Sequence, residues 1–273
     1  MSLDVAGFSL GIRSTESLLP HEQTIQSHVD SLASEIQRDG VQKDPIIVDR
    51  ISGTVLDGMH RLAAFSRLGI AKAACCSVDY GSRSVTLSRW ARVYTLPRGE
   101  SYASGLESAS ITRRVSPADA LEALGRREVG LAVLTSDAAY VPTRSTDLVE
   151  TFDLVLGLDS FSEKHGWRRD FVPEEDLDIS LQEKRNIVIL VQKLTKEDVV
   201  SAAKKRNLFP CKTSMHRIDP RPVAVNFPLA ELSVATTEVL RELLKGKRER
   251  LLPADSLYGG RRYKERLLLL NPA

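Results

Sequence analysis

The sequence predicts an α+β protein, with an N-terminal module over residues 1–95 and a second, α/β domain over residues 96–273. In the first part, helical and strand-like apolar runs follow one another at short intervals. The segment Leu96–Ser101, rich in turn-forming residues, then interrupts this pattern. A length of 273 residues suits one large or two modest domains, and 42% hydrophobic residues supply a sizeable core.

The elements of the N-terminal module are predicted from hydrophobic periodicity and stop signals. Apolar residues recur at helical spacing after Glu22, and Gly40 then provides a helix stop. Two short apolar runs flank the turn Ile51–Gly53, which is typical of a β-hairpin. A second helical stripe ends at Gly69, where a left-handed cap is expected. The predicted helices cover Glu22–Arg38, Met59–Leu68 and Thr86–Tyr94, and the predicted strands cover Pro45–Asp49, Thr54–Leu56 and Ala73–Tyr80.

The pattern in the second domain is weaker. Ser116 precedes one helical run, and Thr195 with Asp198 forms a capping-box pattern before another. The segment Phe161–Leu181 is charged and irregular, so it is expected to be a loop. The predicted helices cover Pro117–Leu124, Asp147–Leu156, Thr195–Lys205 and Thr236–Leu244, and the predicted strands cover Val129–Leu134, Asn186–Val191, Val223–Phe227 and Leu267–Leu270.

Composition excludes several classes of protein. Lys and Arg number 38 against 36 Asp and Glu, whereas a dedicated nucleic-acid binder would show a strong, clustered basic excess. No run approaches the roughly 18 apolar residues of a membrane helix, and no secretory leader pattern opens the sequence. Cys75, Cys76 and Cys211 lack the pattern of a disulfide framework or a zinc site. We therefore expect a cytoplasmic protein with buried, reduced cysteines and with neither nucleic-acid nor membrane partners.

The segment Asp57–Arg61 is predicted to form a tight turn between a strand and a helix. This geometry aims free backbone N–H groups and the positive end of a helix dipole at one point, which favours phosphate. Gly58 permits close approach, and His60 and Arg61 add side-chain donors. The alternative interpretation is structural: Asp57 caps the helix and Gly58 merely turns the chain.

Three segments, Pro20–Gln23, Asp44–Val48 and Leu56–Arg61, together resemble the ParB/sulfiredoxin-like nucleotide-binding fold. Sulfiredoxins carry a catalytic cysteine just before the His-Arg pair, where this chain has Met59. ParB proteins carry a Gly-Glu-Arg-Arg motif followed directly by a helix-turn-helix, whereas Pro-Arg-Gly at 97–99 follows the module here. The free L-serine kinases of this fold are the most similar group, and the resemblance extends in patches over most of the chain.

The resemblance implies roles for particular residues. Glu22 falls where these kinases have their general base. Asp57 is expected to be a second catalytic residue that binds Mg²⁺, helps to activate the hydroxyl or holds the serine ammonium. Without the resemblance, Glu22 is a first-turn acidic residue that favours a helix dipole, and Trp90 is a core residue. The implied nucleotide-binding residues are Gly58, Met59, His60, Arg61, Lys43, Thr213 and Ser214, and the implied substrate-binding residues are Trp90, Lys212 and His216.

The function implied by the resemblance is transfer of a phosphoryl group from ADP or ATP to the hydroxyl of free L-serine, with Mg²⁺ as cofactor. The segment Lys212–His216 is expected to meet the phosphate turn in a cleft between the two domains. No residue pattern chooses between ADP and ATP. The alternatives are a ParB-like, DNA-associated regulator, which would need a helix-turn-helix after Tyr80, and a nucleotide hydrolase.

Overall fold

The computed structural model describes residues 3–5, 8–181, 183–245 and 249–270. The chain divides into two compact units. The first unit comprises Met1–Thr86, Lys196–Cys211 and His216–Ala273, and the second comprises Leu87–Thr195 and Lys212–Met215. This division differs from the predicted domains 1–95 and 96–273, because most of the chain after Thr195 packs with the N-terminal part.

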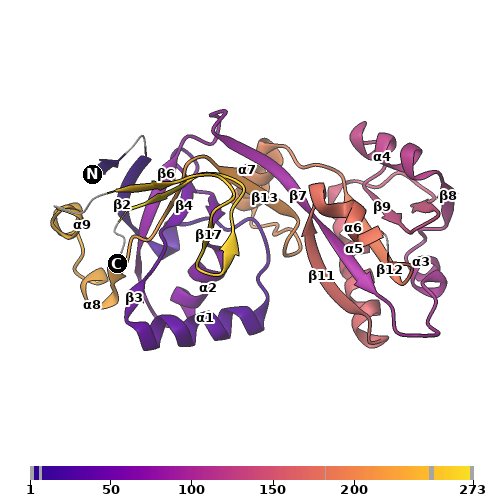
Figure 1. Ribbon diagram of the computed structural model, residues 1–273, viewed down its shortest axis with the longest axis horizontal. Coiled ribbons are helices and arrows are strands. Elements are labelled where there is room, and N and C mark those ends of the chain that lie inside the picture. The colour runs from indigo at the N-terminus through magenta and orange to yellow at the C-terminus, as the bar shows by residue number, and fades with distance from the viewer. Residues whose placement is uncertain (1–2, 6–7, 182, 246–248, 271–273) are drawn as a thin grey trace. The chain divides into compact units, whose positions relative to one another are not determined.

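The first unit is built on a mixed sheet with the strand order β1-β2-β6-β4-β5. The central strand β4 is parallel to β6 and antiparallel to β5, so the predicted hairpin between β4 and β5 is confirmed. All four residues of β4 are buried, as expected for a strand covered on both faces. Helices α1 and α2 pack together against this sheet (Figure 1). The bounds are β1 Leu3–Val5, β2 Phe8–Ser14, β4 Ile46–Asp49, β5 Val55–Asp57, β6 Lys72–Val78, α1 Gln26–Asp39 and α2 Met59–Arg67.

Helix α1 begins later than the sequence pattern predicts. It starts at Gln26, whereas the prediction placed its start at Glu22. The reason is tertiary: the backbone of Glu22 pairs in parallel with Phe209, which holds the preceding segment extended. The predicted end is confirmed, since Gly40 caps the helix with a left-handed φ of 66°.

The later segments of the first unit add short strands around the main sheet. Strands β14, β19 and β16 form a small sheet, in which β14 and β19 are parallel. Strand β15 pairs with β3, so the single strand predicted over Val223–Phe227 is two separate strands. The bounds are β3 Val41–Gln42, α7 Lys196–Lys205, β14 Arg221–Val223, β15 Phe227–Pro228, α8 Leu229–Leu232, α9 Thr237–Leu244, β16 Arg250–Leu252, β17 Leu257–Tyr258, β18 Arg261–Arg262 and β19 Leu267–Leu269.

The second unit is built on an antiparallel sheet with the strand order β11-β7-β12-β9-β10-β8, and β13 also pairs with β7. Its core is an apolar cluster of alternate strand residues and of helix α4. No helix in the described part of the chain is both long and apolar enough to cross a membrane. The bounds are β7 Val85–Thr95, α3 Ala103–Ser108, β8 Arg113–Val115, α4 Pro117–Gly125, β9 Leu131–Leu134, β10 Ala139–Val141, α5 Leu148–Lys164, β11 Arg168–Pro173, α6 Leu177–Leu181, β12 Asn186–Val191 and β13 Ser214–Ile218.

Two predictions in this region are wrong. The helix predicted over Thr86–Tyr94 is strand β7, which pairs with β11 on one side and β12 on the other. Its β-branched and aromatic residues suit a strand, and pairing on both sides favours an extended backbone. The loop predicted over Phe161–Leu181 contains the end of α5, strand β11 and helix α6. The many charged residues of this segment suggested a loop. In the structure some of them form ion pairs instead, such as Arg169 with Asp159 and Glu174 with Lys193.

Gly130 provides a test of packing in the second unit. A methyl group at this position would overlap the hydroxyl oxygens of Thr146 and Thr151. We expect Gly130→Ala to lower the free energy of unfolding by about 1–3 kcal/mol, as overpacking typically does. Gly125→Ala is the matched control, because no atom outside its own helix lies within 4 Å of the added methyl. Urea denaturation measures both, and equal stability of the two variants would contradict the packing described here.

Candidate active site

The predicted phosphate turn is confirmed as a strand–turn–helix. Strand β5 ends at Asp57, and helix α2 begins at Met59. Between them Gly58 is the N-cap, with a left-handed φ of 99° that strongly favours glycine. The first bond of the helical ladder runs from the Leu62 N–H to the Gly58 carbonyl, at 2.8 Å. The alternative in which Asp57 caps the helix is wrong, since Gly58 occupies that position.

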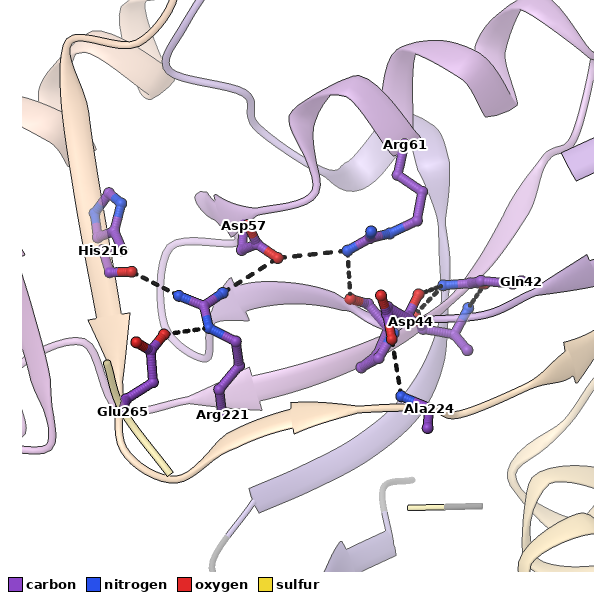
Figure 2. Close-up of polar contacts among 10 residues, drawn as sticks. Gln42, Asp44, Asp57, Arg61, His216, Arg221, Ala224 and Glu265 are labelled. Atoms are coloured by element: carbon purple, nitrogen blue, oxygen red, sulfur yellow. Dashed lines mark hydrogen bonds and ion pairs between the residues drawn. The ribbon is translucent and has the colours of Figure 1, made fainter. Parts of the chain in front are cut away.

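Asp57 instead lies between two guanidinium groups. Its Oδ2 atom is 3.5 Å from Nη2 of Arg61 and 3.3 Å from Nη1 of Arg221 (Figure 2). The Asp57 side chain is 37% exposed, whereas that of Arg221 is 3% exposed. A ligand can therefore approach the carboxylate from the open side while Arg221 holds it from the buried side.

Arg221 connects the turn to two other segments. Its Nε atom donates to Oε1 of the buried Glu265 at 2.5 Å, and its Nη2 atom donates to the His216 carbonyl at 2.7 Å (Figure 2). Burial alone would lower the pKa of Arg221, but the carboxylates of Asp57 and Glu265 outweigh this effect and raise the pKa. Arg221 is therefore charged, and it links His216 to Asp57 within the first unit.

Glu22 is held in an extended segment rather than in a helix. The Gln23 N–H donates to the Phe209 carbonyl at 2.8 Å, and the Phe209 N–H donates to the His21 carbonyl at 2.9 Å. The adjacent His21 ring donates from Nδ1 to the Val55 carbonyl at 2.8 Å. Because Val55 begins the strand that ends at Asp57, this bond ties the Glu22 segment to the phosphate turn.

The environment of Glu22 combines a neutral imidazole with a cavity. Burial lowers the pKa of His21, although Glu22 and the Val55 carbonyl oppose this effect, so the ring is neutral near pH 7. Its Nε2 atom lies 3.9 Å from Oε1 of Glu22. Glu22 also lines a cavity of about 430 Å³ whose lining is mainly apolar and includes Met59, Leu62 and Ala63 of α2. The carboxylate thus borders space that a small molecule can enter.

His216 lies on the same side of the first unit as His21. Its Nε2 atom is 2.7 Å from the Tyr80 hydroxyl, and its ring centroid is 5.3 Å from that of His21. Burial lowers the pKa of His216 well below the usual value, and His21 and Arg221 lower it further. Two neutral imidazoles therefore lie beside the positively charged turn.

Other predicted nucleotide-binding side chains already have protein partners. Arg61 donates from Nη2 to the Pro45 carbonyl at 2.9 Å, so this part of its guanidinium group is bound to the protein and not to a ligand. The Nε2 atom of His60 accepts a hydrogen bond from the Ile25 N–H, at 3.1 Å, so this nitrogen does not donate to a ligand. The Lys43 ammonium lies 2.6 Å from Glu35 and 2.7 Å from Asp39. Hydrogen bonds to these two carboxylates raise the pKa of Lys43.

Four predicted site residues belong to the second unit: Trp90, Lys212, Thr213 and Ser214. The Lys212 ammonium lies 4.7 Å from the centroid of the Trp90 ring, a distance at which a cation–π interaction is favourable. Trp90 is partly exposed, unlike a core tryptophan, whereas Thr213 and Ser214 are buried. Their roles in binding stay predictions.

Parts of the chain are similar in sequence to known proteins. No family model matches the sequence. The chain is 38% identical over 79 residues to an ATP-dependent L-serine kinase of Staphylothermus marinus (28% of this chain, 31% of that protein). It is 35% identical over 89 residues to a ParB-like protein of Sulfolobus acidocaldarius (33% and 44%). It is 23% identical over 228 residues to the ADP-dependent L-serine kinase SerK of Thermococcus kodakarensis (80% and 90%). The first two matches thus span less than half the length of those relatives.

Solved structures extend the similarity to the fold. A glutamate-to-alanine variant of a free serine kinase in complex with ADP gives a TM-score of 0.70 at 21% identity, covering 85% of this chain and 95% of that one. The chain has the free serine kinase fold. The resemblance inferred from the sequence is therefore confirmed, and so is the mixed α/β architecture. The predicted cleft between two domains stays a prediction.

Within this serine kinase fold, the sequence analysis missed Arg221, Glu265 and Tyr80. Arg221 stands between Pro220 and Pro222, and a charged residue enclosed by prolines is a weak signal of a constrained position. Glu265 and Tyr80 carry no local signal. Their importance comes from pairing with distant residues after folding.

Stability should depend on pH through His216. Its folded-state pKa is lowered by burial, while the unfolded chain binds a proton near pH 6.5. The unfolded state therefore holds more protons below about pH 6.5, and the free energy of unfolding should fall as the pH drops through that window. Above it both states are neutral, so the contribution of His216 is constant.

We expect His216→Gln to lose less stability than the wild type between pH 7.5 and pH 5.5, measured by urea denaturation. The amide of glutamine can still reach the Tyr80 hydroxyl, so the comparison isolates the titration. His165→Gln is the control, because His165 is exposed and should leave the dependence unchanged. The His216→Gln variant should keep part of the pH dependence of stability, because the pKa of His21 is also lowered. An unchanged pH dependence in His216→Gln would contradict the expectation.

Proposed function

We propose that this protein is a kinase that transfers a phosphoryl group from ADP or ATP to the hydroxyl of free L-serine, giving O-phospho-L-serine. The observation that carries the proposal is the partly exposed Asp57 carboxylate, which lies at the N-terminus of α2 between two guanidinium groups. The serine kinase names of two relatives support the same activity. Their names differ in the donor, so the choice between ADP and ATP stays open.

The chemistry requires positive groups on the phosphates and a carboxylate near the acceptor hydroxyl. The N-terminus of α2 and Gly58 offer backbone N–H groups to a phosphate. We propose that Glu22 is the general base that accepts the serine hydroxyl proton, because it is 5% exposed and borders a cavity beside the same helix. The neutral His21 ring next to it adds no positive charge on this side of the site.

Magnesium fits this site as a companion of the nucleotide. Mg²⁺ in kinases is usually bound by substrate phosphates and only one or two carboxylates. Within the described residues, no group of three or more His, Cys, Asp or Glu side chains is arranged to hold a metal ion. Asp57 is the carboxylate at the turn that would ligate the ion. When bound, Mg²⁺ would neutralise phosphate charge, and the ammonium of serine is the other cation that Asp57 would attract.

The segment from the second unit completes the proposal. Trp90 with Lys212, and the buried Thr213 and Ser214, supply an aromatic face, a cation and hydroxyl groups. We propose that they bind the serine carboxylate or the phosphates in a cleft between the two parts of the chain. Such an arrangement would exclude water, which competes with serine for the phosphoryl group.

Two other functions need a specific test. The ParB-like relative suggests a DNA-associated regulator as an alternative. That function would need a helix-turn-helix after Tyr80, but residues 81–115 contain strands and a short helix instead. A nucleotide hydrolase would use the same turn without serine. We expect purified protein with Mg²⁺ to form phosphoserine from L-serine with ADP or ATP, detected by mass spectrometry. Nucleotide consumption that is unaffected by serine would instead indicate a hydrolase.

The base assignment predicts a selective loss. Glu22→Gln keeps the size of the side chain but removes its ability to accept a proton, so kcat should fall about 10²–10⁴-fold. The affinity for ADP, measured by calorimetry, should change little because the carboxylate faces the acceptor. Glu122→Gln is the control, since Glu122 is an exposed residue of α4 paired with Arg126. Wild-type turnover in Glu22→Gln would remove Glu22 from the mechanism.

A further inference from the structure

Arg221 contacts three segments that are far apart in the sequence. Its Nε atom meets Glu265 just before β19, its Nη2 atom meets the His216 carbonyl on β13, and its Nη1 atom meets Asp57 at the end of β5 (Figure 2). All four residues belong to the first unit, whose boundary falls within β13 just before His216. The two hydrogen bonds leave the guanidinium little freedom to rotate.

The contact with Asp57 differs in kind from the other two. Nη1 of Arg221 is fully buried and lacks a hydrogen bond within the described residues, yet it lies 3.3 Å from Oδ2 of Asp57. A buried donor without a hydrogen bond is unfavourable, and the attraction to a nearby carboxylate offsets part of that cost. Arg61 approaches the same oxygen from the other side at 3.5 Å. The Asp57 carboxylate is therefore restrained by two cations.

Exposure separates the roles of these residues. A ligand can reach Asp57, but it cannot touch Arg221 or Glu265, whose side chains are 3% and 7% exposed. Any effect of Arg221 on a bound ligand must therefore pass through a residue that it positions. The two candidates are Asp57, through its carboxylate, and the strand of His216, through its backbone.

We propose that Arg221 is a positioning residue, locked by Glu265, that fixes the Asp57 carboxylate for the reaction and ties it to the strand that carries His216. The proposal rests on the proposed function for its kinetic part. Its structural part concerns the position of Asp57 and is independent of the substrate.

A double-mutant cycle tests the kinetic part. Arg221→Lys keeps the positive charge, but a single ammonium cannot make all three contacts at once. We expect kcat to fall about 10- to 100-fold, since a displacement of about 1 Å costs up to about 100-fold, while the melting temperature shows whether the protein remains folded. In an Asp57→Asn background the same change should cause no further loss, because Arg221 acts through the carboxylate.

A purely structural role predicts a different outcome. In that case Arg221→Lys would lower the melting temperature, and any kinetic loss would be the same with and without Asp57. Arg266→Lys is the matched control, because Arg266 forms an exposed ion pair with Asp219 and is expected to keep wild-type kcat. If Arg221→Lys fails to fold, the double variant Arg221→Met with Glu265→Leu replaces the buried charges by apolar groups, which often preserves stability. The same loss of kcat is expected from it.

Crystal structures of the wild type and Arg221→Lys (or, if that variant fails to fold, the Met/Leu double variant) test the structural part. We expect the Asp57 carboxylate to adopt a different rotamer, or two rotamers, in the variant. An unmoved carboxylate, or equal kinetic losses in both backgrounds, overturns the proposal. If the wild type forms no phosphoserine, the proposed function fails, and the position of Asp57 still decides the inference.

Discussion

A guanidinium group buried as deeply as that of Arg221 requires carboxylate partners, because an unpaired charge inside a protein is costly. Glu265 satisfies this requirement from within the core, and Asp57 satisfies it from the edge of the site. Because Arg221 lies on β14, these ion pairs hold the small sheet of β14 and β19 against the end of β5. They therefore also fix the place where helix α2 begins, which is where phosphate is expected to bind.

The candidate site combines two electrostatic environments at short range. Around Asp57, two guanidinium groups and a helix N-terminus give a positive turn. Around Glu22, two buried imidazoles are neutral, and the Tyr80 hydroxyl lies against one of them. The proposed phosphoryl transfer would benefit from this separation, since it needs positive charge on the phosphates and a carboxylate that is not paired with a cation. The hydrogen bond from His21 to the Val55 carbonyl fixes the position of the Glu22 segment relative to the turn that carries Asp57.

The sequence predicted those features that depend on local geometry. Gly58 and Gly40 have left-handed backbone angles, so their positions correctly marked the turn between β5 and α2 and the end of α1. Predictions failed where partners elsewhere in the chain decide the structure. Strand β7 was predicted as a helix, and pairing with β11 on one side and β12 on the other makes it extended. The start of α1 was misplaced because pairing with Phe209 leaves no local pattern.

The residues of the candidate site divide in the same way, into those set by local sequence and those set by distant partners. The turn residues were recognisable because a motif of adjacent residues forms them. Arg221 and Glu265 were not recognisable, since a buried ion pair between distant segments has no spacing rule. The partner of His60 also could not be predicted, because the Ile25 N–H meets it only after α1 and α2 pack. Lys43 instead pairs with Glu35 and Asp39 of the helix that directly precedes it.

The insertion of Leu87–Thr195 within the first unit has a consequence for how the chain folds. Strands β4 and β5 and helix α2 can form from neighbouring residues, but β14 and β19 join them only after the intervening unit has been synthesised. Contacts between such distant segments form slowly, because a long loop must first be closed. A chain emerging from the ribosome would thus acquire its phosphate turn early and the buried partner of Asp57 late. Competence for the proposed catalysis would accordingly be among the last properties that folding produces.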